Sequence, residues 1–497
     1  MTGEAVRGFW PSARFVIATA TLLAAVSACS GGGGDAVSPS PKVSRTVAPG
    51  TNGAPLGVAP MTLASGQGHV ELTALSRTSG NTVTGQFRVS NDSSGELELG
   101  TALFDSTSQN YTTANGIGLL DGTGNKLYLP LSTTDNRCLC SDLSGKVLPP
   151  GGTADLYAVF PAPPGGVARV SVTMPLTVPI QDVPIATGPV RPLPDQNIDP
   201  ATASLAPPRI LPVRSTVEGE EESTDDSGGD RAVRLSSDVL FALNKADLTP
   251  RALALLDGVA RQIDQSTAKT VKVDGYTDTT GNDAINQPLS GRRARAVAQR
   301  LQSLVTRQGV TFQEAGHGSQ DPVASNNTAD GRRKNRRTTV TFARPLPKQT
   351  APPASGGAPY RWAKGAAPVV GSAPFTAPAP SGLKVEVNSL HRDASGVTTL
   401  VWTIRNNGGG PVDISARFDN FRTVNAANAG TASGLELVDT AGKLHYQPLH
   451  ASDNRCLCTE FVRAGAKNQI GAGESVTYAD IYELPTELRT VELQIPW

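Results

Sequence analysis

The sequence has few aromatic residues, no excess of charge of either sign and no long apolar stretch, and common classes of protein need these features. Aromatic residues make up only 5% of the 497 residues, while 51 are glycine and 38 are proline, so much of the chain is expected to be linker. Lysine and arginine balance aspartate and glutamate at 44 each, which argues against a nucleic-acid-binding protein as a whole. No apolar stretch reaches the roughly 20 residues that a membrane-spanning helix needs.

Histidine is also scarce, and this limits the available chemistry. The chain has five histidines, and the H-E-x-x-H, G-x-S-x-G and P-loop patterns do not occur in it. His445 and His450 lie near one cysteine pair but have no histidine counterparts at the matching positions of the other pair. The sequence therefore predicts a protein that is not an enzyme and that carries no cofactor and no metal.

Residues 1–28 have the pattern of an export signal. Arg7 and Arg14 supply positive charge, and residues 15–28 form an apolar stretch that ends in small residues. Cys29 follows directly and resembles the lipidated cysteine of a bacterial lipobox, which predicts a lipid-anchored lipoprotein. The alternative is an ordinary signal peptide with an incidental Cys29. Residues 29–66, rich in Gly, Ser, Pro and Ala, are expected to be a flexible tether.

One hexapeptide occurs twice in the chain. Residues 135–140 and 453–458 both read Asp-Asn-Arg-Cys-Leu-Cys, and the match extends outward with small insertions. Residues 67–178 and 382–497 are therefore predicted to be two homologous copies of one module. Both copies show short strand-like segments separated by turn residues and no useful helical period, which predicts an all-β sandwich.

Four of the five cysteines lie in this repeat. Cys138, Cys140, Cys456 and Cys458 lack the two-residue spacing of a zinc site, and disulfides are expected in an exported protein. Four cysteines allow three pairings, of which one local bridge in each copy is favoured because linkers separate the copies. Because a Cys-x-Cys ring is strained, a thiol-redox role and bridges between the copies stay open as alternatives.

Two linkers are expected between the copies and a central domain. Residues 179–230 are Pro-rich and end in an acidic run, which is typical of a solvated segment. Residues 345–381 are rich in Pro, Ala and Gly and are expected to be a semi-extended spacer. The Tyr360-Arg361-Trp362 sequence within them is expected to belong to that spacer rather than to dock.

Residues 231–344 alternate between strand and helix patterns and predict an α/β domain. Thr249 is a good N-cap with Pro250 at the first helical position, and the apolar face that follows predicts a helix. The other expected elements are a second helix from about residue 289 and strands at 234–241, 271–276, 311–316 and 338–342. Leu253 and Leu304 are expected to face inward from the two helices.

The motifs of this domain resemble a known family. They are Phe241-Ala242-Leu243-Asn244-Lys245-Ala246-Asp247-Leu248, Gly275-Tyr276-Thr277-Asp278-Thr279-Thr280-Gly281, Leu289-Ser290-Gly291-Arg292-Arg293-Ala294 and Asn335-Arg336-Arg337. In this order and spacing they are similar to the OmpA-like, peptidoglycan-binding domain. The resemblance implies an α/β sandwich with helices on one face of a sheet, and non-catalytic binding of the diaminopimelate of peptidoglycan stem peptides.

The resemblance also implies a binding site. Diaminopimelate has a zwitterionic end, and the family positions for its ammonium and its carboxylate correspond to Asp278 and Arg293. Thr277, Asn286 and Ser290 are candidates for neutral hydrogen bonds, and Arg337 is a second candidate cation. The family often has histidine where Tyr276 stands, which puts a histidine-dependent contact in doubt. The plainer alternative is a turn residue, Asp278, paired with Arg293 at the surface.

The charge of the central domain favours the anionic cell wall as its partner. Residues 231–344 hold 18 Lys and Arg against 10 Asp and Glu, a net charge of +8. Residues 331–337 alone suggest nucleic acid or nuclear import, but an export signal makes that interpretation poor. The sequence thus predicts an envelope lipoprotein that tethers a membrane surface to peptidoglycan, in the outer membrane if the cell has one and otherwise on the plasma membrane. The β-modules are expected to bind other envelope proteins, and a wall hydrolase is the weaker alternative.

Overall fold

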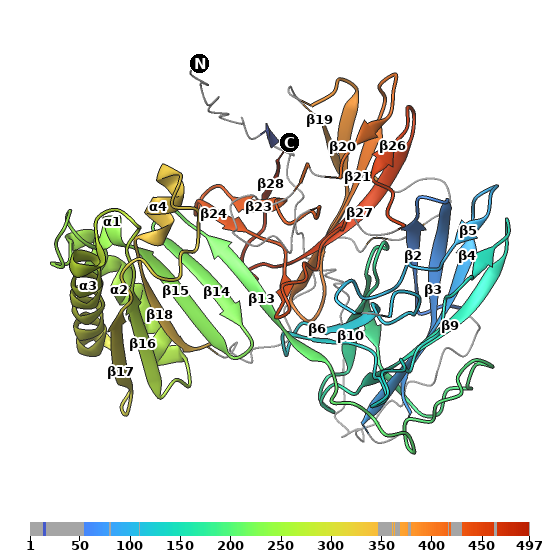
Figure 1. Ribbon diagram of the computed structural model, residues 1–497, viewed down its shortest axis with the longest axis horizontal. Helices are drawn as coiled ribbons and strands as arrows, with labels where there is room; N and C mark the ends of the chain where they lie inside the picture. Colours follow the sequence, from blue (N-terminus) through green and yellow to red (C-terminus); the bar gives the residue numbers. More distant parts are fainter. Residues whose placement is uncertain are drawn as a thin grey trace, which may run out of the picture.

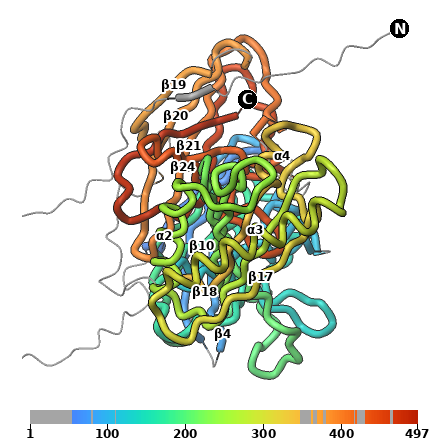
Figure 2. The backbone as a smooth tube through the Cα atoms, turned by 90° about the vertical axis from the view of Figure 1, so that its left-hand side faces the viewer, coloured from blue at the N-terminus to red at the C-terminus, as the bar shows by residue number. Residues whose placement is uncertain are grey.

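The computed structural model describes residues 13–15, 54–78, 81–108, 110–345, 360, 362, 368–375, 379–415, 417–418, 430–461 and 465–496. They form a first β-region (54–187), an α/β region (222–345) and a second β-region (368–496), which Figure 1 shows from blue through green to red. The α/β region lies at one end of the molecule in Figure 1 and faces the viewer in Figure 2. Cys29 and the predicted signal, apart from the strand β1 (Ala13–Phe15), lie outside the described residues. No described helix is long and apolar enough to cross a membrane.

The first β-region has two main sheets that share one core, and β5 and β8 form a separate two-stranded sheet. One sheet has the order β12-β3-β4-β9 with β2 also paired to β3, and the other joins β7, β6, β10 and β11. Buried Phe87 and Phe160 of the first sheet and Leu119 and Val172 of the second belong to this core. The strands are β2 (Gly57–Thr62), β3 (Gln67–Arg77), β4 (Thr82–Asn91), β5 (Leu97–Glu98), β6 (Gly118–Asp121), β7 (Lys126–Tyr128), β8 (Val147–Leu148), β9 (Thr153–Pro161), β10 (Arg169–Thr173), β11 (Ile180–Pro184) and β12 (Ala186–Thr187).

The second β-region is built in a similar way. A sheet of order β19-β20-β21-β27 and the strands β23, β24 and β28 enclose a core rich in aromatic residues, among them Trp402, Phe418, Phe461 and Tyr478. The strands are β19 (Gly371–Pro374), β20 (Leu383–Arg392), β21 (Val397–Asn406), β22 (Val412–Asp413), β23 (Glu436–Asp439), β24 (Leu444–Tyr446), β25 (His450–Ala451), β26 (Gln469–Ile470), β27 (Ser475–Glu483) and β28 (Glu492–Ile495). Strand β1 pairs with β28.

The two β-regions share local details. The register of β3 on β4 shifts between Leu72 and Ala74, and that of β20 on β21 shifts between Val387 and Ser389. The guanidinium groups of Arg77 and Arg392, at the ends of β3 and β20, donate to backbone carbonyls in the segments that follow β9 and β27. Asn91 and Asn406, at the ends of β4 and β21, each donate two hydrogen bonds to loop and strand carbonyls.

Each β-region contains one disulfide. Cys138 is bonded to Cys140 and Cys456 to Cys458, which is the local pairing that the sequence favoured. The structure therefore contains no bridge between the two β-regions among the described residues.

The α/β region has a mixed sheet of order β14-β15-β18-β16-β17, with the helices α2 and α3 on one face (Figure 1). Its elements are β14 (Glu222–Ser227), β15 (Asp230–Ser236), α1 (Ser237–Leu240), α2 (Pro250–Gln265), β16 (Thr270–Gly275), α3 (Asp283–Leu304), β17 (Thr311–Gly316), α4 (Ala329–Asn335) and β18 (Arg337–Ala343). The predicted helix start is confirmed, because the Thr249 hydroxyl accepts from the N–H of Ala252 and Pro250 is the first helical residue.

Some details of this region were predicted wrongly. The predicted strand 234–241 ends at Ser236, and residues 237–240 form the helical turn α1, since a short apolar run does not distinguish a buried strand from a buried turn of helix. Leu253 was expected to face inward but is 38% exposed. The buried face of α2 consists of Ala252, Leu256, Val259, Ala260 and Ile263. The second helix begins at Asp283, earlier than expected, with Asn282 as its N-cap.

Strand β13 (Ile210–Glu218) joins all three regions. It pairs with β7 of the first β-region, with β25 and β24 of the second, and with β14 of the α/β region. The predicted linker 179–230 is therefore wrong for residues 210–230, which form β13, β14 and the start of β15. It is also wrong for residues 180–187, which form β11 and β12 of the first β-region. Partners distant in the sequence determine this structure, and strand propensity depends strongly on such context.

The acidic run is solvated only in part, because Glu220 and Asp230 are exposed whereas Asp226 is buried. Asp226 is 5% exposed and forms ion pairs with Arg231 at 2.7 Å and with Arg344 at 3.0 Å. Arg344 also pairs with Glu483 of the second β-region. The run therefore helps to hold the α/β region against its neighbour.

Two aromatic residues of the second predicted linker make contacts with the β-regions. Tyr360 packs against Val178, Val401 and Ala479, and the ring of Trp362 stacks on His69 with a centroid separation of 4.5 Å. Their assignment to a free spacer is wrong, because burial of large aromatic surface stabilises the docked position. The spacer prediction for 345–381 is also wrong for residues 371–374, which form β19 and pair with β20.

Candidate functional site

The candidate site lies where the loop after β16 meets α3. A Cβ added at Gly275 would lie 2.3 Å from the carbonyl oxygen of Ser290, and one at Gly316 would lie 2.3 Å from the nitrogen of Gly291. Glycine is therefore required at the ends of β16 and β17 for the sheet to approach α3 closely. This approach places the loop that carries Asp278 beside the helix that carries Arg293.

Asp278 is held as a carboxylate in this loop. One of its oxygens accepts from the backbone N–H of Thr280 at 2.8 Å, and the other accepts from the guanidinium of Arg336 at 2.6 Å. Burial raises the pKa of Asp278, but the hydrogen bonds from Arg336 and Thr280 outweigh burial, so the pKa lies below its usual value. Asp278 therefore carries a negative charge at neutral pH although it is only 6% exposed.

Arg336 links Asp278 to a second carboxylate. Asp238 of α1 accepts two hydrogen bonds from Arg336, at 2.8 and 2.5 Å. The hydrogen bond with Asp238 is the largest influence on Arg336 and, together with Asp278, raises the pKa of its guanidinium. The result is a row of alternating charges, Asp238, Arg336 and Asp278, that fixes the position of each group.

Arg293 has no such carboxylate partner. It is 6% exposed, its Nε donates to the backbone carbonyl of Lys245 at 3.0 Å, and its guanidinium lies 5.1 Å from the ring centre of Phe241. No ion pair among the described residues includes it. Burial lowers the pKa of Arg293, and the charge of Asp238 offsets only part of this effect. A buried cation without a bound anion favours the approach of an anionic ligand.

Arg337 lies apart from this row of charges. Its guanidinium stacks 3.7 Å from the ring centre of Tyr276 and donates to the backbone carbonyl of Asp321 at 2.9 Å. Burial lowers the pKa of Arg337 to about 10. The sequence selected Arg337 as the second cation, whereas the structure places Arg336 against Asp278. Arg336 is the C-cap of α4, whereas Arg337 is the first residue of β18, and the two side chains have different surroundings.

The predicted neutral residues mainly support the loops. The hydroxyl of Ser290 donates to Gln287 and accepts from the N–H of Gly318, and the side chain is fully buried. The Asn286 side chain donates to the carbonyl of Thr280, and the Thr277 hydroxyl donates to the carbonyl of Asp278. These contacts hold the loop that presents Asp278.

Sequence reasoning missed Asp238 and the role of Arg336. Arg336 was visible in the Asn-Arg-Arg motif, but nothing in the sequence indicates which of its two arginines faces Asp278. Asn335 explains the choice, because its side chain accepts from the N–H groups of Val323 and Ala324 and donates to the carbonyl of Ala324. This anchoring fixes the end of α4 and the direction of the residue that follows.

A family model described as the OmpA family matches residues 240–336. Among curated relatives, the putative lipoprotein YfiB of Escherichia coli is 35% identical over 122 residues, which cover 24% of this chain and 75% of that protein. The chain belongs to the OmpA family. The matched part is the α/β region, so this region is the OmpA-like domain, and its order of strands and helices agrees with the α/β fold that the resemblance implied.

Two further relatives show how the OmpA-like domain is shared. The probable lipoprotein YiaD of Escherichia coli is 35% identical over 134 residues, which cover 26% of this chain and 59% of that protein. The peptidoglycan-binding protein ArfA of Mycobacterium tuberculosis is 38% identical over 102 residues, covering 20% of this chain and 31% of that protein. The similarity thus spans about three fifths of YiaD and under a third of ArfA.

Proposed function

We propose that the OmpA-like domain binds peptidoglycan without cutting it, by recognising the diaminopimelate of its stem peptides. The observation that carries this proposal is the buried Arg293, a cation that pairs with no carboxylate among the described residues, in the same site as the ionised Asp278. The name of the relative ArfA, a peptidoglycan-binding protein, supports the same ligand.

The site suits a zwitterionic group. Asp278 has lone pairs left for an ammonium group, and Arg293 offers a planar guanidinium to a carboxylate. The positive charge of Arg336 reinforces the attraction for a carboxylate, since it is close enough to lower the pKa of Arg293. In a buried site both ionic hydrogen bonds are stronger than they would be in water.

The remaining parts of the chain suggest a tether. We infer a lipid on Cys29 that holds the protein on an envelope membrane. The tether predicted for residues 29–66 is wrong for residues 57–62, which form β2 with Met61 in the core, so the connection would be the segment between Cys29 and that strand. We also infer that the two β-regions are copies of one duplicated sandwich module; their shared bulge, asparagine and arginine contacts support this origin. Their partners would be other envelope proteins.

The proposal is tested by sedimentation of the full chain with purified peptidoglycan. Asp278→Ala with Arg293→Ala should weaken binding by about 100-fold, because two charge-assisted hydrogen bonds are lost. The matched control is Asp257→Ala with Arg300→Ala, an aspartate–arginine pair at 3.2 Å on the outer side of the same domain. Binding by the first variant at wild-type strength overturns the site. Release of soluble wall fragments by the wild type indicates a hydrolase instead.

A further inference from the structure

The second disulfide lies at the interface between the two β-regions. Cys456 and Cys458 line a cavity of about 100 Å³ whose opposite wall is formed by residues 173–177 of the first β-region. Cys456 is 6% exposed, whereas Cys458 is only partly buried. The bridge therefore lies at a contact between regions, and Cys458 is the more exposed of its two residues.

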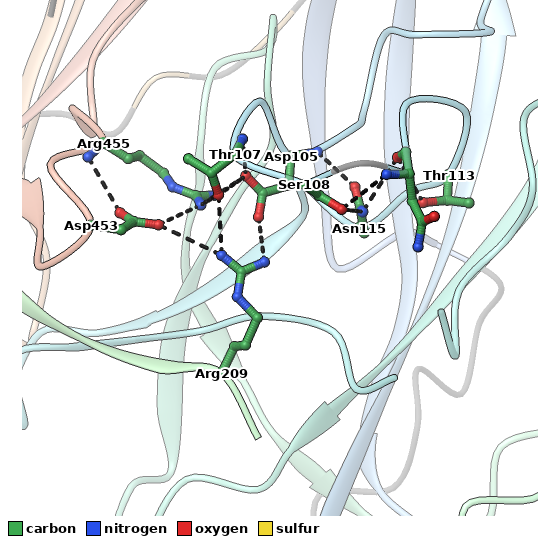
Figure 3. Close-up of polar contacts among 9 residues, drawn as sticks. Asp105, Thr107, Ser108, Thr113, Asn115, Arg209, Asp453 and Arg455 are labelled. Carbon is green, nitrogen blue, oxygen red and sulfur yellow. Dashed lines mark hydrogen bonds and ion pairs between the residues drawn. The ribbon is translucent and has the colours of Figure 1, made fainter. Parts of the chain in front are cut away.

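Arg455, the residue before Cys456, binds to the first β-region. Arg455 donates to the carboxylate of Asp105 at 2.8 Å and to Asp453 at 2.7 Å (Figure 3). Asp105 is fully buried and is also held by Arg209 at 2.5 Å. Burial raises the pKa of Asp105, but Arg455 and its other partners outweigh this and lower it, so Asp105 is ionised and depends on these cations.

Asp105 in turn organises its own loop. Its carboxylate accepts from the N–H and the hydroxyl of Thr107, and its own N–H donates to the side chain of Asn115. The N–H of Gly116 donates to the carbonyl of Leu103 at 2.8 Å. The loop 103–117 of one region is therefore coupled to Arg455 of the other.

Leu457, which lies between the two bridged cysteines, makes apolar contacts across the same interface. Leu457 belongs to a cluster with Leu120, Leu127 and Leu129 of the first β-region and Val213 of β13. Its N–H donates to the carbonyl of Leu449, and its carbonyl accepts from the N–H of Ile481. The bridge fixes the three residues 456–458 and thereby the directions of both Leu457 and Arg455.

The identical hexapeptide of the first β-region has other surroundings. Arg137 pairs with Asp135, and their side chains are 65% and 62% exposed. Leu139 packs against Leu193, Ile198 and Leu205 of the segment that follows its own region. Among the described residues, the first bridge therefore supports no contact between the regions, and it provides a matched control.

We propose that the Cys456–Cys458 bridge is a site of reversible reduction by a dithiol reductant, and that its opening releases Arg455 from Asp105. A thiolate of the reductant attacks Sγ of Cys458, the bond to Cys456 breaks, and the Cys456 sulfur leaves as a thiolate that takes up a proton. The second thiol of the reductant then attacks the mixed disulfide and frees the Cys458 thiol. Two electrons and two protons pass from the dithiol to the bridge, and the reductant becomes a disulfide.

Hydrogen exchange of the full chain tests the proposal. Loss of the second bridge, by Cys456→Ser with Cys458→Ser, should speed exchange of the amides in residues 103–117 by about tenfold, although these residues lie in the other region. Arg455→Met with the bridge intact should produce the same change. Cys138→Ser with Cys140→Ser should leave the exchange of residues 103–117 unchanged.

If the Cys456→Ser, Cys458→Ser variant does not fold, chemical reduction of the wild type provides the same test. Native protein treated with dithiothreitol should expose the thiols of Cys456 and Cys458 to a labelling reagent, in step with faster exchange at residues 103–117. If dithiothreitol leaves the Cys456–Cys458 bridge of the native protein intact, the proposal is overturned. It is equally overturned if exchange at residues 103–117 does not respond to the opening of that bridge, or responds as strongly to loss of the first.

Discussion

The two β-regions carry the same six residues, 135–140 and 453–458, but use them differently. In the first region the arginine of this sequence is exposed and pairs with its own neighbour, whereas in the second it is 11% exposed and reaches the buried Asp105 of the other region. The difference shows that the local sequence determines the disulfide and the turn, while the segment packed against them determines what the arginine does.

The same comparison extends into the two cores. Phe87 and Ala158 of the first region occupy the strand positions that Trp402 and Asp480 occupy in the second, judged from the pairing of β4 with β9 and of β21 with β27. Trp402 donates its indole N–H to Asp480 at 2.6 Å, and Asp480 also accepts from the N–H of Thr459 at 2.8 Å. The second core therefore contains a buried acid that the first core lacks at the matching position.

The largest expected effect concerns pH. Burial raises the pKa of Asp480 to about 7, although hydrogen bonds from Thr459 and Trp402 oppose the rise. The folded state binds the proton more tightly than the unfolded state, so the contribution to stability is full below about pH 4 and falls as the pH rises to about 7, by about 4 kcal/mol. Asp480→Ala with Trp402→Phe, which installs the pair of the first region, should remove this decline.

Native-state hydrogen exchange of β21 and β27 between pH 4 and 8 measures the effect. The opening free energies of these strands should fall with pH in the wild type and fall much less in the double variant. Strands β4 and β9 serve as the internal control, because Ala158 cannot titrate. Equal pH dependence of β21 in both proteins would show that Asp480 is not the responsible group.

The second effect separates the two hexapeptides. Arg455→Ala leaves the buried Asp105 with Arg209 as its one close cation among the described residues, and should lower the free energy of unfolding by about 3 kcal/mol. Arg137→Ala removes an exposed ion pair and should cause no measurable change. Urea unfolding of the two full-length variants gives the comparison, and equal losses would contradict the different roles assigned to the two arginines.

The smallest effect compares polar pairs on adjacent strands. The hydroxyl of Thr403 bonds to Asn388 at 2.7 Å and to Thr477 at 2.8 Å in a buried position, so Thr403→Val should cost about 1.5 kcal/mol. Arg88, at the matching strand position of the first region, pairs with Asp155 with both side chains 47% exposed. Arg88→Ala should therefore cost about 0.5 kcal/mol or less in urea unfolding. A larger loss for Arg88 would reverse the ranking.

The fold of the OmpA-like domain could be predicted from the sequence where the signals are local. Thr249 and Pro250 define the start of α2, and the apolar residues of β16, β17 and β18 have the composition of strands. Strand β13 could not be predicted in this way, because its partners lie as far away as residues 126–128 and 445–451. A Pro-flanked, acidic stretch gives no local sign of such pairing.

The candidate site was predictable only in part, for a similar reason. The motifs selected Asp278 and Arg293. The structure keeps Asp278 ionised and gives Arg293 no carboxylate partner within the part of the chain that it describes. The role of Asp238 depends on the short helix α1, which brings it within 2.8 Å of Arg336 across almost 100 residues of sequence. Contacts between elements so far apart follow from tertiary packing and not from motif spacing.

The central claim is that the OmpA-like domain recognises diaminopimelate through Asp278 and Arg293. Calorimetric titration of the full chain with a diaminopimelate-containing stem peptide tests it most directly. The account predicts binding by the wild type and by the Asp257→Ala, Arg300→Ala control, and about 100-fold weaker binding by the Asp278→Ala, Arg293→Ala variant. Equal affinity of that variant and the wild type, or no binding by the wild type, would contradict it.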